Sequence, residues 1–448
     1  MPSLREAQLR HTRHYKEILA TVNDLYLEGG EALRRGLRLF DLEWINIQTG
    51  QAWVAVNVRD DDLIAELCTV YPRVGAHLLN LRQHPRERIR WLEAALRAAQ
   101  QLKDPATEGV HLGNLGVAYE ALGEARRAIE FYEQDLSVTR RFGNRRGEGQ
   151  ALGNLGNAYY ALGETRRAVE FYERRLAIAR EISDLRGEGL VLGNLGRAYA
   201  ALGDARRAIE FYERRLDVAH KTDDLRGLGK GLGNLGNAYY LLGDIRRAIK
   251  CHERGLTVLC EIGDRRGEGK VLGNLGIAYA KLGEIRRAIE YYEQGLVILR
   301  EIGDRRGEGA MLGNLGNARA SLGETRQAIQ VYGRRLTIAR EIGDRRGEGA
   351  TLHNLGKAYD ALGETHRAIE FYEQSLIIKR EIDDRRGEGN TLWNLSRTFN
   401  ELGNRSQAII YAEDALKVYE QIEAPRAAEV RQQLTEWQVQ AGASSEKF

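Results

Sequence analysis

The sequence contains few residues that interrupt helices or cross-link a chain. Only five prolines occur in 448 residues, and all of them lie outside residues 106–424. Proline inside a helix removes a hydrogen bond and costs roughly 3 kcal/mol, so this long proline-free stretch favours helices. The three cysteines, Cys68, Cys251 and Cys260, are too few for a disulfide framework in a chain of this length.

An excess of charge and a long apolar run are also missing. The 67 basic and 64 acidic residues leave a net charge of only +3, which argues against a general polyanion binder. No apolar run approaches the ~18 residues of a membrane span, and the N-terminal residues are too charged for a signal peptide. We therefore expect a cytoplasmic protein with neither a membrane nor a nucleic acid as its partner.

The central stretch repeats with a period of 40 residues. The string LGNLG recurs six times, continues as LHNLG and decays to LWNLS, with starts at Leu112, Leu152, Leu192, Leu232, Leu272, Leu312, Leu352 and Leu392. A fixed period in this range is typical of a solenoid, whose units bury their apolar faces only by stacking. We expect three regions: a helical region with a degenerate capping repeat (1–108), eight repeats (109–428), and a capping helix with a tail (429–448).

Each repeat has the pattern of two amphipathic helices. The second repeat illustrates it, with one predicted face on each helix: Leu152, Leu155, Tyr159 and Leu162 on the first, and Ala168, Val169, Tyr172, Leu176 and Ile178 on the second. Gly163 is placed to end the first helix in the left-handed conformation. Asp184 and its counterparts are placed to cap the next first helix.

These residues resemble the tetratricopeptide repeat (TPR). Leu152, Leu155, Gly156 and Tyr159 match its W-x2-L-G-x2-Y pattern with Leu in the Trp place, and Ala168 and Tyr172 match A-x3-F. The resemblance implies an all-α fold, a right-handed TPR superhelix of about eight helix-turn-helix repeats. The closing Pro is absent, and a small residue of the pattern is replaced by Asp135, Arg175, Arg215 and Arg335.

Forty-residue repeats of this kind resemble those of kinesin light chains and of the C-terminal sensor arrays of bacterial NB-ARC or STAND-type signalling ATPases. The N-terminal segment, with RHTRHYKEIL and FDLEWINIQTGQAWV, resembles the helical region that leads into such arrays. The resemblance implies that this chain is the sensor portion of such a receptor.

The sequence does not present the motifs of catalysis. A Walker A loop is absent, and the nearest string, residues 227–231, lacks the hydroxyl that would bind Mg²⁺. Cys251 and Cys260 fall on opposite sides of one helix, which argues against a metal site. The arginine pairs have acidic neighbours, so they favour ion pairs between repeats over phosphate contacts. We expect no enzyme activity, no cofactor and no metal.

An asparagine recurs at the same place of every first helix. By the resemblance these helices line the concave groove, and related arrays hold partner peptides with such a ladder. The ladder is Asn114, Asn154, Asn194, Asn234, Asn274, Asn314, Asn354 and Asn394. An amide offers both a donor and an acceptor to a peptide backbone. The alternative is that these side chains bond to the backbone of the neighbouring repeat and only maintain the stack.

Specificity is expected from residues near the ladder that vary. Three residues further on, the candidates for peptide binding are Asn157, Arg197, Asn237, Asn317, Lys357 and Arg397, beside Val117 and Ile277. The remaining candidates are Tyr160, Tyr240, His353 and Trp393. The C-terminal set suits an acidic or aromatic peptide. Alternatively, Trp393 packs against the final cap, since terminal repeats are often atypical.

The sequence thus predicts a non-enzymatic scaffold that binds a protein or peptide in its concave groove, as the ligand-sensing module of a bacterial signalling or defence receptor. The alternative is an assembly module that self-associates or docks onto a partner ATPase.

Overall fold

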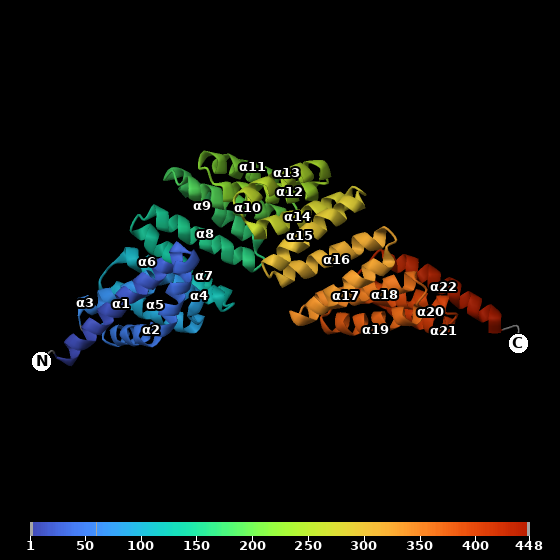
Figure 1. The fold of residues 1–448 in the computed structure, drawn as a ribbon, viewed down its shortest axis with the longest axis horizontal. Coiled ribbons are helices and arrows are strands. Elements are labelled where there is room, and N and C mark those ends of the chain that lie inside the picture. The colour runs from blue at the N-terminus through green and yellow to red at the C-terminus, as the bar shows by residue number, and fades with distance from the viewer. Residues whose placement is uncertain (1–2, 60, 446–448) are drawn as a thin grey trace. The chain divides into compact units, whose positions relative to one another are not determined.

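The computed structural model describes residues 3–59 and 61–445, and this part of the chain forms 22 α-helices and no strand (Figure 1). The all-α prediction is therefore confirmed. None of the helices described is both long enough and apolar enough to cross a bilayer. The chain divides between Asp223 and Asp224 into two compact units.

Five helices precede the repeats. They are α1 (Leu4–Glu28), α2 (Gly30–Val56), α3 (Asp62–Val74), α4 (Ala76–Arg82) and α5 (Pro85–Gln101). Their core contains Phe40, Ile47 and Tyr71, and Trp44 stacks on Trp91 with ring centroids 5.7 Å apart. The buried Tyr71 hydroxyl donates to the Thr12 carbonyl at 2.8 Å, which ties α3 to α1.

The pattern of residues 62–81 predicts one helix, but the structure breaks it after Val74. Pro72 lacks the N–H that would continue the hydrogen-bond ladder. Gly75 then passes so close to Leu19 that an added methyl group would overlap that side chain. The chain therefore restarts as α4 instead of continuing α3.

Eight helix pairs follow, and we number them as repeats 1–8. They are α6 (Pro105–Ala121) with α7 (Ala125–Arg141), α8 (Arg145–Ala161) with α9 (Thr165–Glu181), α10 (Leu185–Ala201) with α11 (Ala205–Lys221), α12 (Leu225–Leu242) with α13 (Ile245–Glu261), α14 (Arg265–Lys281) with α15 (Ile285–Glu301), α16 (Arg305–Ser321) with α17 (Thr325–Glu341), α18 (Arg345–Ala361) with α19 (Thr365–Glu381), and α20 (Arg385–Glu401) with α21 (Arg405–Gln421). Repeats 1–3 lie in the first compact unit and repeats 4–8 in the second. Within each unit, consecutive helices pack on one another, as in an α-solenoid.

The predicted helix ends are confirmed. Gly163 has φ 81°, in the left-handed region that favours glycine. The carboxylate of Asp184 accepts a hydrogen bond from the Gly187 amide at 2.9 Å, and equivalent caps begin the first helices of repeats 2 and 4–8. Each repeat therefore contains its own start and stop signals.

The predicted apolar faces form the core with one exception. Leu155 and Tyr172 are fully buried, whereas Leu162 is 39% exposed because it lies at the C-cap of α8. The Tyr172 ring packs on Gly156 so closely that a side chain there would overlap it. Each glycine costs about 1 kcal/mol of helix propensity, so stacking of the helices must stabilise these glycine-rich segments.

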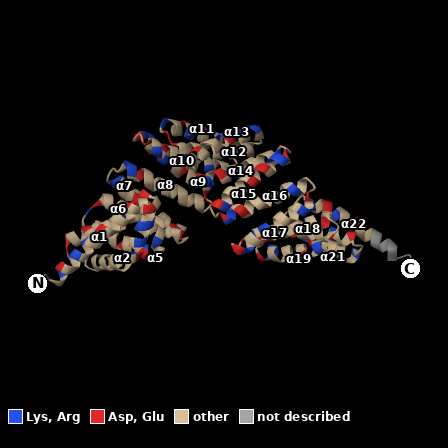
Figure 2. Ribbon diagram, in the orientation of Figure 1, with Lys and Arg blue, Asp and Glu red and all other residues tan. Residues whose placement is uncertain are grey.

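Ion pairs connect successive repeats, as predicted. Arg340 at the end of α17 donates to Glu348 in α18 at 2.8 Å, and Arg345 bridges Glu348 and Glu381. The same arrangement joins α15 with α16, where Arg300 donates to Glu308 at 2.7 Å. Figure 2 shows basic and acidic residues interspersed over the helices.

The last helix, α22 (Arg426–Ser445), packs on repeat 8. Its apolar stripe, Val430, Leu434 and Trp437, is buried in one cluster with Trp393 and Tyr419. This helix therefore covers the apolar face of the final repeat.

Candidate functional site

The ladder asparagines occupy the same turn of every first helix. On each helix the residue that follows the asparagine is a buried leucine, for example Leu155 after Asn154. All eight asparagine side chains are half-buried. The helix thus holds each amide at a fixed place, partly open to solvent.

Three ladder asparagines are hydrogen-bonded to an asparagine of the preceding repeat. The Asn194 amide donates to Asn157 Oδ1 at 3.2 Å, and Asn354 donates to Asn317 Oδ1 at 3.0 Å. Asn274 and Asn237 form the third such pair, at 3.0 Å. We call these three ladder residues the paired asparagines. The acceptor is an asparagine side chain and not the backbone that the stacking alternative assumed.

Buried tyrosines fix two of these acceptors. Tyr172 donates its hydroxyl to Asn157 Oδ1 at 2.8 Å, and Tyr332 donates to Asn317 Oδ1 at 2.7 Å. Burial raises the pKa of each phenol to about 12, so both stay protonated donors at neutral pH. The carbonyl oxygen of each acceptor amide therefore receives two hydrogen bonds.

Other ladder residues keep their amides available. Within the described part of the chain, Asn114, Asn154, Asn234 and Asn314 make no side-chain hydrogen bond to another residue. We call them the open asparagines. An acceptor is missing where the residue three positions after the preceding ladder asparagine is not itself an asparagine. Val117 and Ile277 are such residues, in the repeats that precede Asn154 and Asn314. In repeats 2–7 the chain therefore places an asparagine acceptor only in every second repeat.

The variable positions lie beside the ladder. Asn157, Arg197, Asn317, Lys357 and Arg397 are exposed, whereas Asn237, Tyr160 and Tyr240 are half-buried. The guanidinium of Arg197 lies over the Tyr160 ring, 5.2 Å from its centroid. This cation–π contact places an exposed positive charge beside the ladder in repeats 2 and 3.

Trp393 is buried beneath the last helix. Its side chain is 3% exposed, and its ring stacks on Trp437 of α22 with centroids 5.9 Å apart. The expected contact with a bound peptide is therefore corrected to the alternative, packing against the cap. Ala415 is buried in the same cluster.

His353 is also engaged inside the fold. Its Nδ1 lies 3.0 Å from Thr391 Oγ1, and its Nε2 lies 3.3 Å from the amide of Asn394. Burial, with a smaller effect of Lys379, Lys357 and Arg426, lowers the pKa of the imidazole to about 3. His353 is therefore neutral at physiological pH and bridges repeats 7 and 8.

A family model described as tetratricopeptide repeat matches seven overlapping windows. They are residues 110–181, 150–221, 187–261, 227–301, 268–341, 307–381 and 349–421. The chain belongs to the tetratricopeptide repeat family. Comparison of the whole sequence with curated proteins gives no match.

Several solved structures share the TPR fold. A STAND protein with a tetratricopeptide repeat sensor from Pyrococcus horikoshii has a TM-score of 0.62 and 14% identity, and the match covers 94% of this chain and 65% of that one. The apo quorum sensor NprR from B. thuringiensis has a TM-score of 0.52 and 15% identity, with 76% and 98% covered. Aspartyl phosphate phosphatase F from Bacillus subtilis has a TM-score of 0.50 and 15% identity, with 85% and 96% covered. At these identities the likeness concerns the fold alone.

Within this TPR array, the tyrosine of the TPR pattern makes an aromatic contact between the two helices of a repeat. Tyr159 in α8 stacks on Phe171 in α9 with centroids 5.3 Å apart, and most repeats have such a pair. Repeat 6 instead has Arg319 and Val331 at these positions. Arg319 stands at the tyrosine position of the TPR pattern, so the pattern of a single repeat does not reveal the exception, whereas comparing all eight repeats at that position does.

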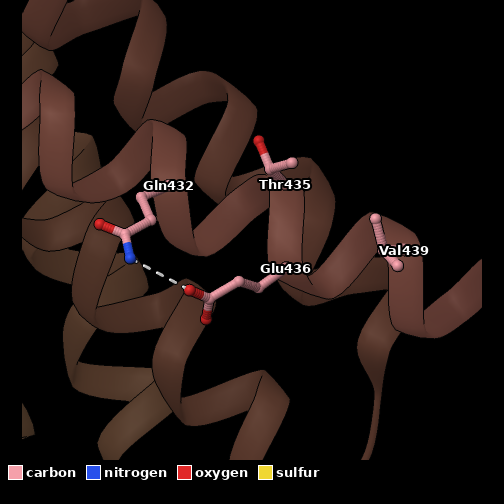
Figure 3. A pocket seen from close by; sticks show the side chains of 4 residues that line it. All are labelled: Gln432, Thr435, Glu436 and Val439. Atoms are coloured by element: carbon pink, nitrogen blue, oxygen red, sulfur yellow. Dashed lines mark hydrogen bonds between the residues drawn. The ribbon is translucent and has the colours of Figure 1, made fainter.

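The outer face of α22 is a poor candidate for a ligand site. A hollow of about 450 Å³ is lined by Gln432, Thr435, Glu436 and Val439 (Figure 3). All four come from one helix, and Gln432 donates to Glu436 at 3.2 Å. The hollow is therefore part of an exposed helix surface. Among the described residues, no three metal-binding side chains gather in a way that could hold an ion.

Proposed function

We propose that this TPR array binds an extended protein segment along the asparagine ladder. The TPR fold is a protein-interaction scaffold, and the observation that supports this proposal is the set of open asparagines. Their amides are half-buried, fixed on helices and not used within the array. A peptide backbone would satisfy both the donor and the acceptor of each amide.

The variable positions would then select the sequence that binds. Exposed Arg197, Lys357 and Arg397 favour acidic residues in the bound segment. We further propose that binding serves a cytoplasmic bacterial receptor as its ligand-sensing module. Fold likeness to the STAND protein with a TPR sensor supports this extension.

The open and paired asparagines allow a matched test. Peptides selected on the full chain from a random display library are measured against two triple variants. Asn114/Asn154/Asn314→Ala removes open amides, so we expect peptide affinity to fall about 100-fold, at about 1 kcal/mol per hydrogen bond, with unchanged helix content and melting temperature. Asn194/Asn274/Asn354→Ala removes hydrogen bonds between repeats and is expected to lower the melting temperature.

Equal peptide affinity for the open-asparagine variant and the parent would contradict groove binding. The competing assembly function makes a different prediction. Self-association would appear in analytical ultracentrifugation as a mass that rises with concentration and does not respond to either triple variant.

A further inference from the structure

Aromatic stacking closes one side of most repeats. In repeats 1, 2, 3, 5, 7 and 8 a ring of the first helix stacks on a ring of the second, with centroids 5.1 to 5.4 Å apart. In repeat 2 two arginines cover this pair, Arg167 over the Tyr159 ring and Arg174 over the Phe171 ring. Repeat 4 keeps Tyr239 with Cys251 opposite.

Repeat 6 lacks both rings. Arg319 takes the first position and Val331 the second. A pocket of about 560 Å³ opens at this place between α15, α16 and α17. Its lining includes the buried side chains of Leu296, Leu312 and Val331. A volume of this size is within the range of ligand pockets, roughly 300–1,000 Å³.

Arg319 replaces the polar contact of the missing tyrosine but not its ring. In repeats 3 and 5 the tyrosine hydroxyl donates to a glutamate of the preceding second helix, as Tyr279 does to Glu253 at 3.1 Å. Arg319 donates to the equivalent Glu293 at 2.6 Å and to Glu324 at 2.9 Å. These contacts hold its planar guanidinium at the pocket, where it can stack on an aromatic ring.

Two acidic residues are missing on the α17 side of the pocket, while Glu293 of α15 lines it and is paired with Arg319. Where repeat 2 has Glu170 and Glu173, repeat 6 has Gln330 and Gly333. Arg334 is exposed, and within the described residues it makes no ion pair and lies over no ring. Its counterpart Arg174 lies over the Phe171 ring, 5.6 Å from the centroid. An incoming ring would restore this contact, and a carboxylate beside it would meet Arg334.

We propose that the pocket between α15, α16 and α17 binds an aromatic side chain of a partner protein, with an acidic residue directly after it. The incoming ring takes the place that the stacked pair fills in other repeats. This site is separate from the groove, because Arg319 follows Asn314 by five residues, about 140° further round the helix. It therefore stands whether or not the ladder binds peptide.

The aromatic residues of the other repeats suggest a variant that should fill the pocket and block binding. The probe is an acetylated and amidated Phe-Asp dipeptide containing fluorophenylalanine, titrated with the full chain by fluorine NMR. We expect a saturable shift with the parent and at least a tenfold weaker response with Arg319→Tyr/Val331→Phe. This double variant rebuilds the stack of the other repeats, so its melting temperature should not fall.

Two further arms test the chemistry. Arg334→Glu should weaken Phe-Asp at least fivefold and strengthen a Phe-Lys probe, whereas Arg174→Glu in repeat 2 should change neither. A cyclohexylalanine-Asp probe should bind at least fivefold more weakly, because it lacks the π-face. Equal binding of Phe-Asp to the parent and the double variant would overturn the proposal. Binding of phenylacetate without binding of the dipeptide would also overturn it, in favour of a small aromatic acid.

Discussion

Facing residues on the two helices of a repeat are matched in size. Arg175 fills the space beside Gly153 so fully that any side chain at Gly153 would overlap it, and Arg215 does the same at Gly193. In repeats 7 and 8 the large residue is instead on the first helix, as His353 or Trp393. The arginines that depart from the TPR pattern are therefore accommodated by glycine on the partner helix.

A second facing pair gives a prediction for acid stability. His252 replaces the tyrosine of other repeats and packs on Gly236. Burial lowers the pKa of His252 to about 4, below the ordinary value near 6.5, so the unfolded chain takes up the proton first. The stability that the protein keeps while His252 is neutral in both the folded and the unfolded chain is full above pH 6.5 and is lost as the pH falls toward 4.

We therefore expect the gain in the free energy of unfolding from His252→Tyr to be about 2 kcal/mol larger at pH 5 than at pH 8. At pH 5 the unfolded parent chain takes up a proton on His252 that the buried imidazole does not, and this loss is absent in the tyrosine variant. Tyrosine is also the residue that packs on the equivalent glycine in other repeats. Urea unfolding at the two pH values measures the effect. His366→Gln, at an exposed position, is the control, and an equal gain at both pH values would contradict the explanation.

At the scale of helices, the junctions between repeats depend on shared ion pairs. Glu348 is buried and accepts from Arg340 and Arg345, which come from successive helices. Repeat 4 has Leu225 and Leu228 at the equivalent places of Arg345 and Glu348. The bridge is therefore a property of particular junctions and not of the family pattern.

We expect Glu348→Gln to destabilise the protein by about 1 kcal/mol, because the arginine partners are half exposed and screened by solvent. The loss should shrink in 1 M salt, where the parent pair is already weakened. Thermal unfolding at low and high salt measures it. Glu370→Gln, on an exposed surface, should have no effect, and a loss at Glu348 that does not depend on salt would indicate packing instead of charge.

The sequence predicts helices better than it predicts contacts. The 40-residue period and the Gly and Asp signals place the helix ends within a few residues, because local capping determines them. The break after Val74 depends on the approach of Gly75 to Leu19, which is a tertiary contact. The roles of Trp393 and His353 depend on α22 and on Thr391, and the pairing of Asn194 depends on Asn157. No periodicity within one repeat reveals such partners.

At the scale of the whole chain, the two compact units do not coincide with the regions that the sequence predicts. The compact units separate between Asp223 and Asp224, within the series of repeats, whereas the sequence divides the chain at 108 and 428. The domain division by sequence and the right-handed superhelix remain predictions. A repeat array is stabilised mainly by contacts between neighbours, so a local loss should stay local.

The terminal helix α22 offers a test of this locality. Trp437→Ala removes a buried ring that stacks on Trp393, and truncations of this kind cost about 3 to 5 kcal/mol. Because each repeat contacts mainly its neighbours, we expect faster hydrogen exchange in α20 and α21 and unchanged exchange in α14. Val439→Ala, at an exposed position of the same helix, should leave all three helices unchanged. Equally faster exchange across α12–α21 would mean that repeats 4–8 open as one cooperative unit, and the array would then transmit the loss of its end to every ladder residue in that unit.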